Sequence, residues 1–498
     1  MAGRFLNLFK PIARVFPEIK MPERRVRFNE KIFWTALVLV IFLIMSEVPL
    51  FGVEKTALGE LAALRIIFAS SRGTLMELGI GPIVTAGLIL QLLVGSQMIQ
   101  CDMSKPEDRS LFTSASKVFA IVLTGVQASA YIIGGMFGTS AQQMGPIAVI
   151  IFLQLIAAGI IVQLLDELVQ KGWGFGSGIS LFIMAGVAQR IFLDSFSLAG
   201  PMGDSNYFGA FIAIAQIVPQ IFSGGSIMIR NSETGTIENK GLWTWQHIFL
   251  RPEDPTLPAL MGFIATLVTF LAIIYMEGVR VELPLSYAGY RGFRSRYPIK
   301  LLYVSNLPVI FASALFANVY FFSQLFWSMY NSSNTNFWIN LLGQFKQEGN
   351  NVTPIGGLVY YVTAPRSFVE VLNSPAKAFG YLGILVAFCI VFSLTWLEVG
   401  GLGPSTVANQ LMGAGMQIPG YRRSEQAVVS VLKRYIPAVT VLGGVVVGVI
   451  AGVSDFFGVF GSGMGILLSV GIIYQYYQIL VQERAAEMYP AFRKIFGD

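Results

Sequence analysis

Residues 77–94 of this 498-residue chain read ELGIGPIVTAGLILQLLV. A Gly-Ile-Gly-Pro break at 79–82 opens a run that is almost wholly apolar. Gly and Pro together interrupt a helix, and interrupted backbone inside a membrane is tolerated only where it meets protein or a water-filled cavity. We therefore expect 79–99 to cross a membrane. The shorter, more charged stretch Ala62–Arg72 before it is either a re-entrant piece or an ordinary outer loop.

The composition requires lipid as a solvent for much of the surface. Hydrophobic residues make up 54% of the chain and charged residues only 12%, about half the usual globular share of charge. Two cysteines and one histidine allow at most one disulfide and are too few for a Cys/His zinc site. We expect an all-α polytopic membrane protein with no metal and no cofactor.

Ten segments are apolar enough to cross a bilayer, which takes roughly 20 residues each. An eleventh, weaker segment at 207–222 contains Pro219 and could be the outer continuation of the fifth helix after a break. The ten expected spans are 33–50, 79–99, 117–136, 145–165, 179–196, 258–277, 301–322, 378–397, 437–457 and 464–482.

These spans predict the domain organisation and the orientation of the chain. Two halves of five spans, 33–200 and 258–482, flank an outer loop at 201–257, and a second long outer loop covers 323–377. Of the 34 Lys and Arg residues, 24 fall on the side that holds both termini (1–32 and 483–498) and 10 on the other. Positive residues mark cytoplasmic segments, so we expect both termini in the cytoplasm.

Several segments admit two interpretations. Residues 1–32 form either an amphipathic helix on the inner membrane surface or a disordered basic tail. The run KGWGFGSG at 171–178 lacks the Lys-Ser/Thr of a phosphate loop, so we interpret it as a flexible cytoplasmic turn. Gly444, Gly448 and Gly452 form a small-residue face, either for internal packing or for a partner helix.

Polar side chains within spans and basic cytoplasmic loops are the candidate functional groups. Amides inside spans face another helix or a cavity, where they act either in function or as interhelical glue. Paired arginines in the loops 278–300 and 398–436 suit phosphate, and hence anionic lipid or RNA. The polar residues in the spans are Thr85, Gln91, Gln127 and Asn318, and the basic loop residues are Arg291, Arg294, Arg296 and Lys300 in one loop and Arg422, Arg423, Lys433 and Arg434 in the other.

The motif at 77–96 resembles the second helix of the SecY family, the channel subunit of the protein translocase. Further similar motifs follow in the same order as in the family, and their sequences are most similar to those of archaeal members. The outer loops 197–257 and 323–377 are larger than is usual for the family. These motifs are Gly176–Ile179, Tyr297–Lys300, Tyr303–Ile310, Ala317-Asn318 and Lys433–Pro437.

The resemblance implies an hourglass of two pseudo-symmetric halves with a plug, a lateral gate and no enzymatic activity. The gate latch would be Thr85, Gln127 and Asn318. The ribosome would dock on the loop arginines Arg291, Arg294, Arg296, Arg422 and Arg423. The plug at about 62–72 would include Leu64, Ile67, Ser70 and Arg72. The pore ring would consist of Ile80, Val84, Ile179, Ile183, Ile310 and Leu468.

The function implied is conduction of signal-bearing polypeptides across the cell membrane and release of transmembrane segments into lipid. Implied partners are a SecE/gamma-type subunit, a small beta-type subunit, the ribosome, nascent chains and membrane lipid. The alternative is a small-solute secondary transporter, but that class shows polar or charged residues at the midplane, where this chain has mostly Ile, Val and Leu. A membrane enzyme would need a cluster of catalytic groups that the sequence does not show.

Overall fold

The computed structural model describes most of the chain, in two compact units. Unit 1 comprises Met1–Val187, Ala314–Tyr360 and Leu468–Asp498, and unit 2 comprises Ala188–Ser313 and Tyr361–Leu467. The described residues are 11, 17–24, 26–53, 71, 73–95, 98–99, 106–134, 137, 145–200, 207–224, 226–230, 237–242, 244–251, 257–287, 294–302, 307–348, 351–365, 367–413, 416–417 and 425–488.

Nine helices within these residues are long and apolar enough to cross a membrane. A tenth, α4 (Gly81–Gly95), falls at the expected second span but has only 15 residues. The nine are α2 (Phe28–Glu47), α5 (Pro106–Ile133), α7 (Pro146–Leu168), α8 (Gly178–Phe196), α11 (Leu260–Gly278), α12 (Leu307–Tyr330), α16 (Pro375–Val399), α18 (Glu425–Phe456) and α19 (Gly463–Met488).

Two helices begin well before the boundaries expected from hydropathy. The third span starts at Pro106 rather than at 117, and the ninth at Glu425 rather than at 437. Their first turns are polar, so a search for apolar residues does not detect them. Pro437 lies inside α18 and does not end it.

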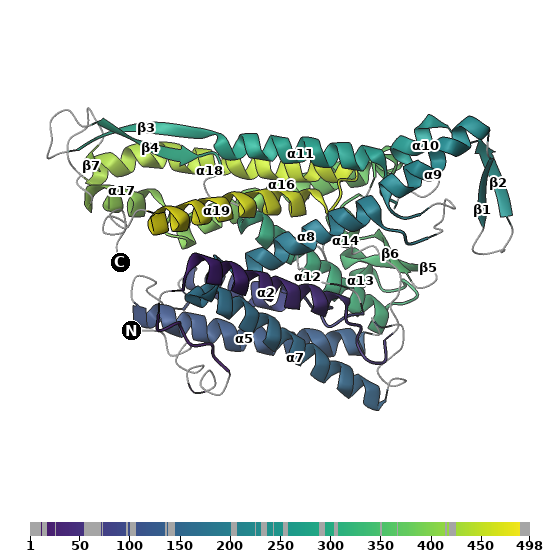
Figure 1. Cartoon of the computed structure of the whole chain (residues 1–498), viewed down its shortest axis with the longest axis horizontal. Helices are drawn as coiled ribbons and strands as arrows, with labels where there is room; N and C mark the ends of the chain where they lie inside the picture. The colour runs from purple at the N-terminus through teal and green to yellow at the C-terminus, as the bar shows by residue number, and fades with distance from the viewer. Residues whose placement is uncertain are drawn as a thin grey trace. The chain divides into compact units, whose positions relative to one another are not determined.

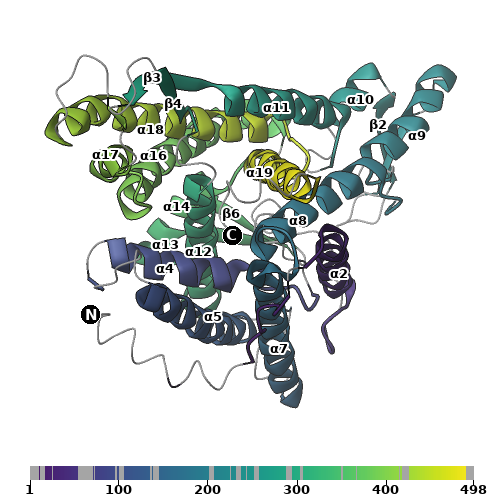
Figure 2. The same ribbon diagram turned by 60° about the vertical axis from the view of Figure 1, so that its left-hand side comes forward.

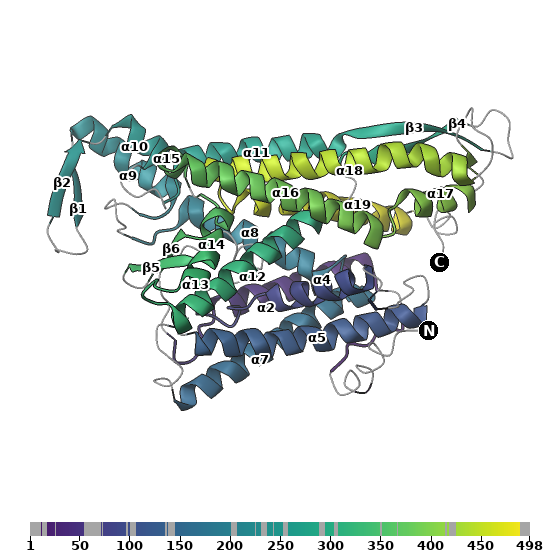
Figure 3. The same ribbon diagram turned by 180° about the vertical axis from the view of Figure 1, so that it is seen from behind.

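In unit 1, α5 packs against both α4 and α7 (Figure 3). Leu90 and Ala115 belong to a buried cluster between α4 and α5, and Ala128 and Leu155 to one between α5 and α7. Each cluster places aliphatic side chains on the inner face of the helices. The opposite faces carry exposed apolar residues such as Val122 and Leu153, as expected for a bundle in lipid.

In unit 2, α16 and α18 lie side by side over most of their length (Figure 2). The glycine face of α18 makes this contact: a Cβ on Gly448 would lie 2.9 Å from the Cα of Val386, and one on Gly444 would lie 3.2 Å from the Cα of Ile390. The expectation of internal packing is confirmed, because these glycines let the backbone of α18 approach α16 closely.

The loops contain short elements, of which only α9 (Ala210–Ser223), at the expected weak segment 207–222, was suggested by the sequence. The 197–257 loop holds α9, the hairpin β1–β2 (Ser226–Arg230 and Ile237–Leu242) and α10 (Trp245–Leu250). The 323–377 loop holds α13 (Phe337–Leu342), the hairpin β5–β6 (Gln344–Glu348 and Asn351–Gly356), α14 (Leu358–Val362) and α15 (Phe368–Asn373). In unit 2, at the end opposite α9 and α10 (Figure 1), β3 (Arg280–Tyr287) pairs with both β4 (Arg294–Lys300) and β7 (Met416–Gln417).

Asparagine side chains organise the start of the second outer loop. Buried Asn331 donates from Nδ2 to Asn340 Oδ1 over 2.7 Å and accepts from the Asn336 backbone N–H over 2.9 Å. Asn334 donates to the carbonyl of Phe345 over 3.0 Å. Asn331 also opens an Asn-Ser-Ser glycosylation triplet. Because its Nδ2 is buried and bonded, we infer a structural role for this asparagine.

Candidate functional site

The expected break before the second helix is present. Gly79 has a left-handed φ of 55°, and α4 begins two residues later at Gly81, with Pro82 in its first turn. The segment leading into it is fixed, because Leu50 donates to the carbonyl of Gly73 over 2.9 Å and the carboxylate of buried Glu77 accepts from the Gly73 N–H. The plug residues Leu64, Ile67, Ser70 and Arg72 lie outside the described residues.

The start of α8 is capped by a carboxylate from the end of α7. Buried Asp166 accepts from the backbone N–H of Ile179 over 3.0 Å and from Gln170 Nε2 over 2.8 Å. A carboxylate is stabilising there, because the first turn of a helix has free N–H groups and a positive dipole end. Asp166 thereby sets where α8 begins, and with it the positions of Ile179 and Ile183.

The glycine-rich turn before α8 is ordered, not flexible as expected. The hydroxyl of Tyr476, on α19, accepts from the Ser177 N–H over 3.0 Å and lies 2.9 Å from the Phe175 carbonyl. The Phe175 N–H donates to Thr35 Oγ1 on α2 over 3.1 Å. Two helices of unit 1, α2 and α19, thus hold the turn through contacts that no local sequence pattern indicates.

The six expected ring residues share one local feature. Each lies at or near the beginning of a helix: Ile80 and Val84 at α4, Ile179 and Ile183 at α8, Ile310 at α12 and Leu468 at α19. Three of these starts follow a glycine with left-handed φ, namely Gly79 (55°), Gly176 (66°) and Gly461 (79°). Ile80, Ile183 and Leu468 are fully buried and the other three are half-buried.

Five of the ring residues belong to unit 1, and Ile310 belongs to unit 2. The start of α19 is capped as the start of α8 is: buried Asp455 accepts from the Gly463 N–H over 2.7 Å and from the Tyr381 hydroxyl over 2.9 Å. The role of the six residues as a pore ring stays a prediction.

The three latch residues are half-buried and all lie in unit 1. Asn318 donates from Nδ2 to the Ala314 carbonyl of its own helix over 2.8 Å. In the part of the chain that the structure describes, no hydrogen bond joins Asn318 to Thr85 or Gln127. The latch therefore stays a prediction.

An aromatic pair joins α5 to α12 one turn beyond the latch residues. Tyr131 and Phe321 stack with ring centroids 4.9 Å apart and planes 18° apart. Tyr131 lies four residues after Gln127, and Phe321 lies three residues after Asn318. Sequence reasoning missed this contact because both residues resemble ordinary lipid-facing aromatics.

The two expected basic loops belong to one folded module of unit 2. Leu283 and Ile299 from β3 and β4, Val407 from α17 (Pro404–Gly413) and Leu432 from α18 share one buried cluster. Arg296 is exposed and pairs with Glu282 over 2.6 Å, an ion pair that raises the pKa of Arg296 and lowers that of Glu282. The backbone of Arg294 pairs with Ser286. Arg291, Arg422 and Arg423 lie outside the described residues.

A charge cluster joins the N-terminal segment to other parts of unit 1. Lys171 pairs with Glu18 over 2.6 Å and with Glu167 over 2.7 Å, and Lys117 also pairs with Glu167 over 2.7 Å. The hydrogen bond from Lys171 lowers the pKa of Glu18, so this carboxylate stays ionised to a lower pH than an ordinary Glu side chain. Residues 17–22 around Glu18 form neither a helix nor a strand, and most of the expected amphipathic helix lies outside the described residues.

One buried charge pair was missed from the sequence. Asp194 in α8 is paired with Arg190 over 3.0 Å, at a spacing of four residues that a search for i,i+4 ion pairs would have found. Within the described residues, no group of three His, Cys, Asp or Glu side chains could hold a metal ion.

Family profiles of known proteins match almost the whole chain. The SecY family profile matches residues 74–477, and a profile for the plug domain of Sec61p matches residues 40–73. A solved structure described as a protein-conducting channel is 35% identical, with a TM-score of 0.75, and the match covers 97% of this chain and 98% of that one.

Two further solved structures were described in complex with ribosomes. Sec61 from a canine ribosome–channel complex of the endoplasmic reticulum is 34% identical with a TM-score of 0.73, and the match covers 97% of this chain and 98% of that one. The idle yeast Ssh1 complex bound to the 80S ribosome includes a chain that is 27% identical with a TM-score of 0.72; the match covers 95% of this chain and 93% of that one. Since the SecY profile covers more than half of its length, this multi-pass membrane chain belongs to the SecY family.

Proposed function

We propose that this protein is the protein-conducting channel subunit of a general secretory translocase. The observation that carries this proposal is the match to a plug domain at 40–73, immediately before the interrupted start of α4. A plug followed by a broken helix fits a path for a whole polypeptide that must be closed when idle. A small-solute transporter would instead need a polar binding site at the midplane.

Translocation in proteoliposomes tests this function directly. The purified protein, reconstituted with its co-purifying subunits, is expected to move a signal-bearing polypeptide into a protease-protected space. The same vesicles are expected not to accumulate amino acids, sugars or nucleosides. Solute uptake without polypeptide protection would instead establish the transporter class.

The proposed mechanism uses positioning and apolar contact rather than chemical catalysis. Ile80, Val84, Ile179, Ile183, Ile310 and Leu468 form the waist, where aliphatic side chains contact any passing sequence without specific bonds. An apolar constriction also excludes ions by dewetting. Asp166 and Asp455 are positioning residues, because they hold the first residues of α8 and α19. The plug at 62–72 closes the path from the outer side.

We assign the partners from the family and from the basic module. A SecE/gamma-type subunit and a small beta-type subunit complete the channel in the cell membrane, with both termini of this chain in the cytoplasm. The ribosome docks on the module built from β3, β4, β7 and α17. Exposed Arg296, Lys433 and Arg434 lie on this module, and in the sequence Arg291 falls between β3 and β4 while Arg422 and Arg423 fall between β7 and α18.

The orientation is tested by labelling single cysteines in intact cells. In a background without Cys101 and Cys389, we expect a membrane-impermeant thiol reagent to label Ser332→Cys and to leave Ser424→Cys unlabelled until the membrane is opened. The reason is the split of 24 to 10 in Lys and Arg between the two sides. The reverse labelling pattern would refute the orientation.

The Tyr131–Phe321 stack is expected to hold the lateral gate closed. An aromatic pair contributes about 0.5–1.5 kcal/mol, so Phe321→Ala should shift the gate equilibrium about two- to tenfold toward the open state. A series of signal sequences of falling hydrophobicity measures this shift, and the variant should accept weaker signals. Phe326→Ala, an exposed position on the same helix, is the control. Equal thresholds in wild type and Phe321→Ala would remove the stack from the gate.

Asn318→Leu examines the latch in the same assay. Interhelical hydrogen bonds in membranes contribute about 0.6–2 kcal/mol. A changed signal threshold supports a latch role for Asn318, whereas an unchanged one leaves its amide as part of its own helix, where it bonds to Ala314.

A further inference from the structure

The pair of helices α9 and α10 in unit 2 is unusually apolar for a loop between two spans. No charged residue occurs in 207–224 or in 244–250. These helices connect the end of α8 to the start of α11, at the end of unit 2 opposite the β3–β4 hairpin (Figure 1). A loop surrounded by water is normally polar, so this composition points to a different solvent.

The start of α9 is fixed against the end of α8. Gly209 donates to the Ser197 carbonyl over 3.0 Å, and a Cβ at Gly209 would lie 2.6 Å from the Ser197 nitrogen. The Phe208 N–H donates to the Ala199 carbonyl over 2.7 Å. Glycine at 209 permits this approach, so α9 continues from α8 after a break, as the sequence suggested.

A buried arginine holds the end of the α9–α10 pair that leads into α11. The guanidinium of Arg251, which follows α10, donates to the carbonyls of Tyr207 over 2.9 Å, Phe208 over 3.1 Å and Pro258 over 3.1 Å. It thereby joins the segment before α9 to the segment before α11. The inner face of the pair is closed by a cluster of Ala213, Ile217 and Ile248. The two helices therefore form one ordered structural element, with an inner face that packs on the protein and an outer face that does not.

That outer face carries exposed aromatic side chains. Phe222 at the end of α9 is 77% exposed, and Trp245 at the start of α10 is 57% exposed; their rings meet edge to face with centroids 6.1 Å apart. Phe249, one turn after Trp245, is 43% exposed. Large aromatic residues with a polar edge, above all Trp, gather at membrane–water interfaces.

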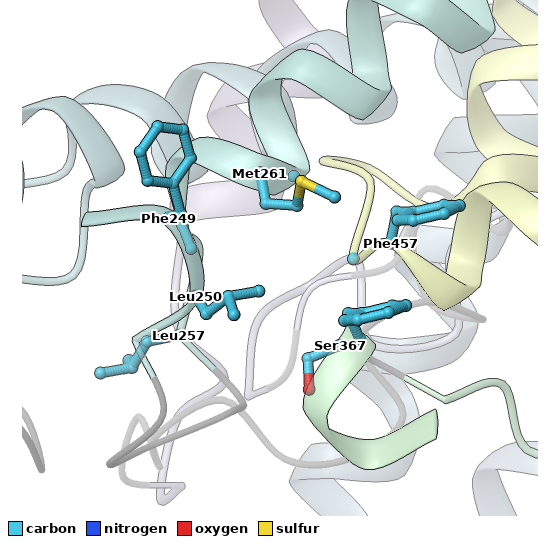
Figure 4. A pocket seen from close by; sticks show the side chains of 10 residues that line it. Phe249, Leu250, Leu257, Met261, Ser367 and Phe457 are labelled. Carbon is cyan, nitrogen blue, oxygen red and sulfur yellow. The ribbon is translucent and has the colours of Figure 1, made fainter. Parts of the chain in front are cut away.

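This face is continuous along the chain with surfaces that lie in the bilayer. The last turns of α8 expose Phe192 and Phe196, and α11 exposes an apolar stripe that includes Leu267, Val268 and Leu271. Behind Phe249, a small hollow is lined by Leu250, Met261 and Phe457 among others (Figure 4). Phe457 stacks on Phe368, with ring centroids 5.6 Å apart, and closes its far side.

We propose that α9 and α10 form an apolar foot that rests in the headgroup–hydrocarbon boundary of the leaflet opposite the β3–β4 hairpin. Its occupant is membrane lipid, and Phe222 and Trp245 contact the lipid chains near the headgroups. The foot anchors the outer ends of α8 and α11 at a fixed depth. Hydrophobic burial provides the affinity, since the foot has no charge to attract anionic headgroups.

Collision accessibility of spin labels tests the foot in the complete complex in nanodiscs. In a Cys101→Ser, Cys389→Ala background, nitroxides are placed by Phe222→Cys and Trp245→Cys. Val268→Cys on α11 is the lipid control and Ser332→Cys the water control. We expect the two foot positions to collide several-fold more often with oxygen than with a water-soluble nickel chelate, as position 268 does.

The other outcomes overturn the proposal. Preferential collision with the chelate at 222 and 245, as at 332, would place the foot in water. Low collision with both reagents and an immobilised spectrum would mean that protein covers it. Trp245→Glu should move the label at 222 toward the chelate, whereas Trp245→Phe should not. The readout needs no translocation, so its failure leaves the proposed function untouched.

Discussion

Replacing Ile183 and Ile310 together by glycine is expected to make the idle channel leak ions. Both side chains are assigned to an apolar waist contributed by several helices. Ions do not cross a narrow aliphatic constriction, because water inside it loses its hydrogen-bond partners. Removing two of the branched side chains widens and wets the constriction. Single-channel recording in a planar bilayer should show openings without substrate, whereas Ile183→Leu with Ile310→Leu should stay closed.

A matched pair of variants separates the waist from ordinary core. Leu181 and Val309 are buried on the same two helices, next to the assigned ring positions. Changing both to glycine removes similar volume and adds the same helix penalty, about 1 kcal/mol for each glycine. Removing a buried aliphatic side chain costs about 2–5 kcal/mol of stability per site in either pair. The temperature of thermal unfolding in detergent should therefore fall by a similar amount in both variants. Only the Ile183/Ile310 pair should leak. A folded Ile183/Ile310 variant without added conductance would exclude these residues from the pore.

The sequence predicts the starts of three of the four ring helices, α4, α8 and α19, because the signals there are local, whereas α12 begins at Leu307 rather than at 301. Gly79 and Pro82 mark the beginning of α4, and left-handed glycines precede α8 and α19. What holds these starts in place was not predictable. Asp166 caps Ile179 across 13 residues, and Tyr476 reaches Ser177 across 299 residues. A carboxylate at a helix end looks the same in sequence whether it faces solvent or caps another helix.

In the loops too, the sequence indicates local features but not the long-range contacts that hold them. The position of the loops between spans followed from hydropathy, but β3, β4 and β7 were not expected, although apolar residues alternate with polar ones or proline along β3. Their pairing depends on a cluster that brings Leu283, Val407 and Leu432 together from three separate stretches. The 278–300 and 398–436 loops therefore looked independent in sequence, although they form one module. This module changes the expectation for the arginines, since a change in one loop can act through the other.

Reversing Arg422 and Arg423 to Glu is expected to weaken ribosome binding by at least about 100-fold at moderate salt. A hydrogen bond to a charged group contributes about 1.5–3 kcal/mol, so two guanidinium–phosphate interactions contribute about 3 kcal/mol or more. Arginine suits this role because its planar fork binds phosphate oxygens in pairs. Co-sedimentation with empty ribosomes over a range of salt concentrations measures both the affinity and its salt dependence. The plot of log affinity against log salt concentration has a negative slope, and the magnitude of that slope should decrease by about 2, because each arginine neutralises one phosphate.

Arg296 requires a different design because it is already paired with Glu282. Arg296→Glu alone removes the ion pair and reverses a charge, so weaker binding could reflect a disturbed hairpin. The exchange variant Glu282→Arg with Arg296→Glu restores the pair while it moves the positive charge to the neighbouring strand. If Arg296 acts only within the hairpin, the exchange restores ribosome binding. If Arg296 contacts RNA phosphate, binding stays weak although the module is intact. Ribosome affinity that is insensitive to salt and to all of these changes would mean that anionic lipid, rather than RNA, is the partner of this basic module.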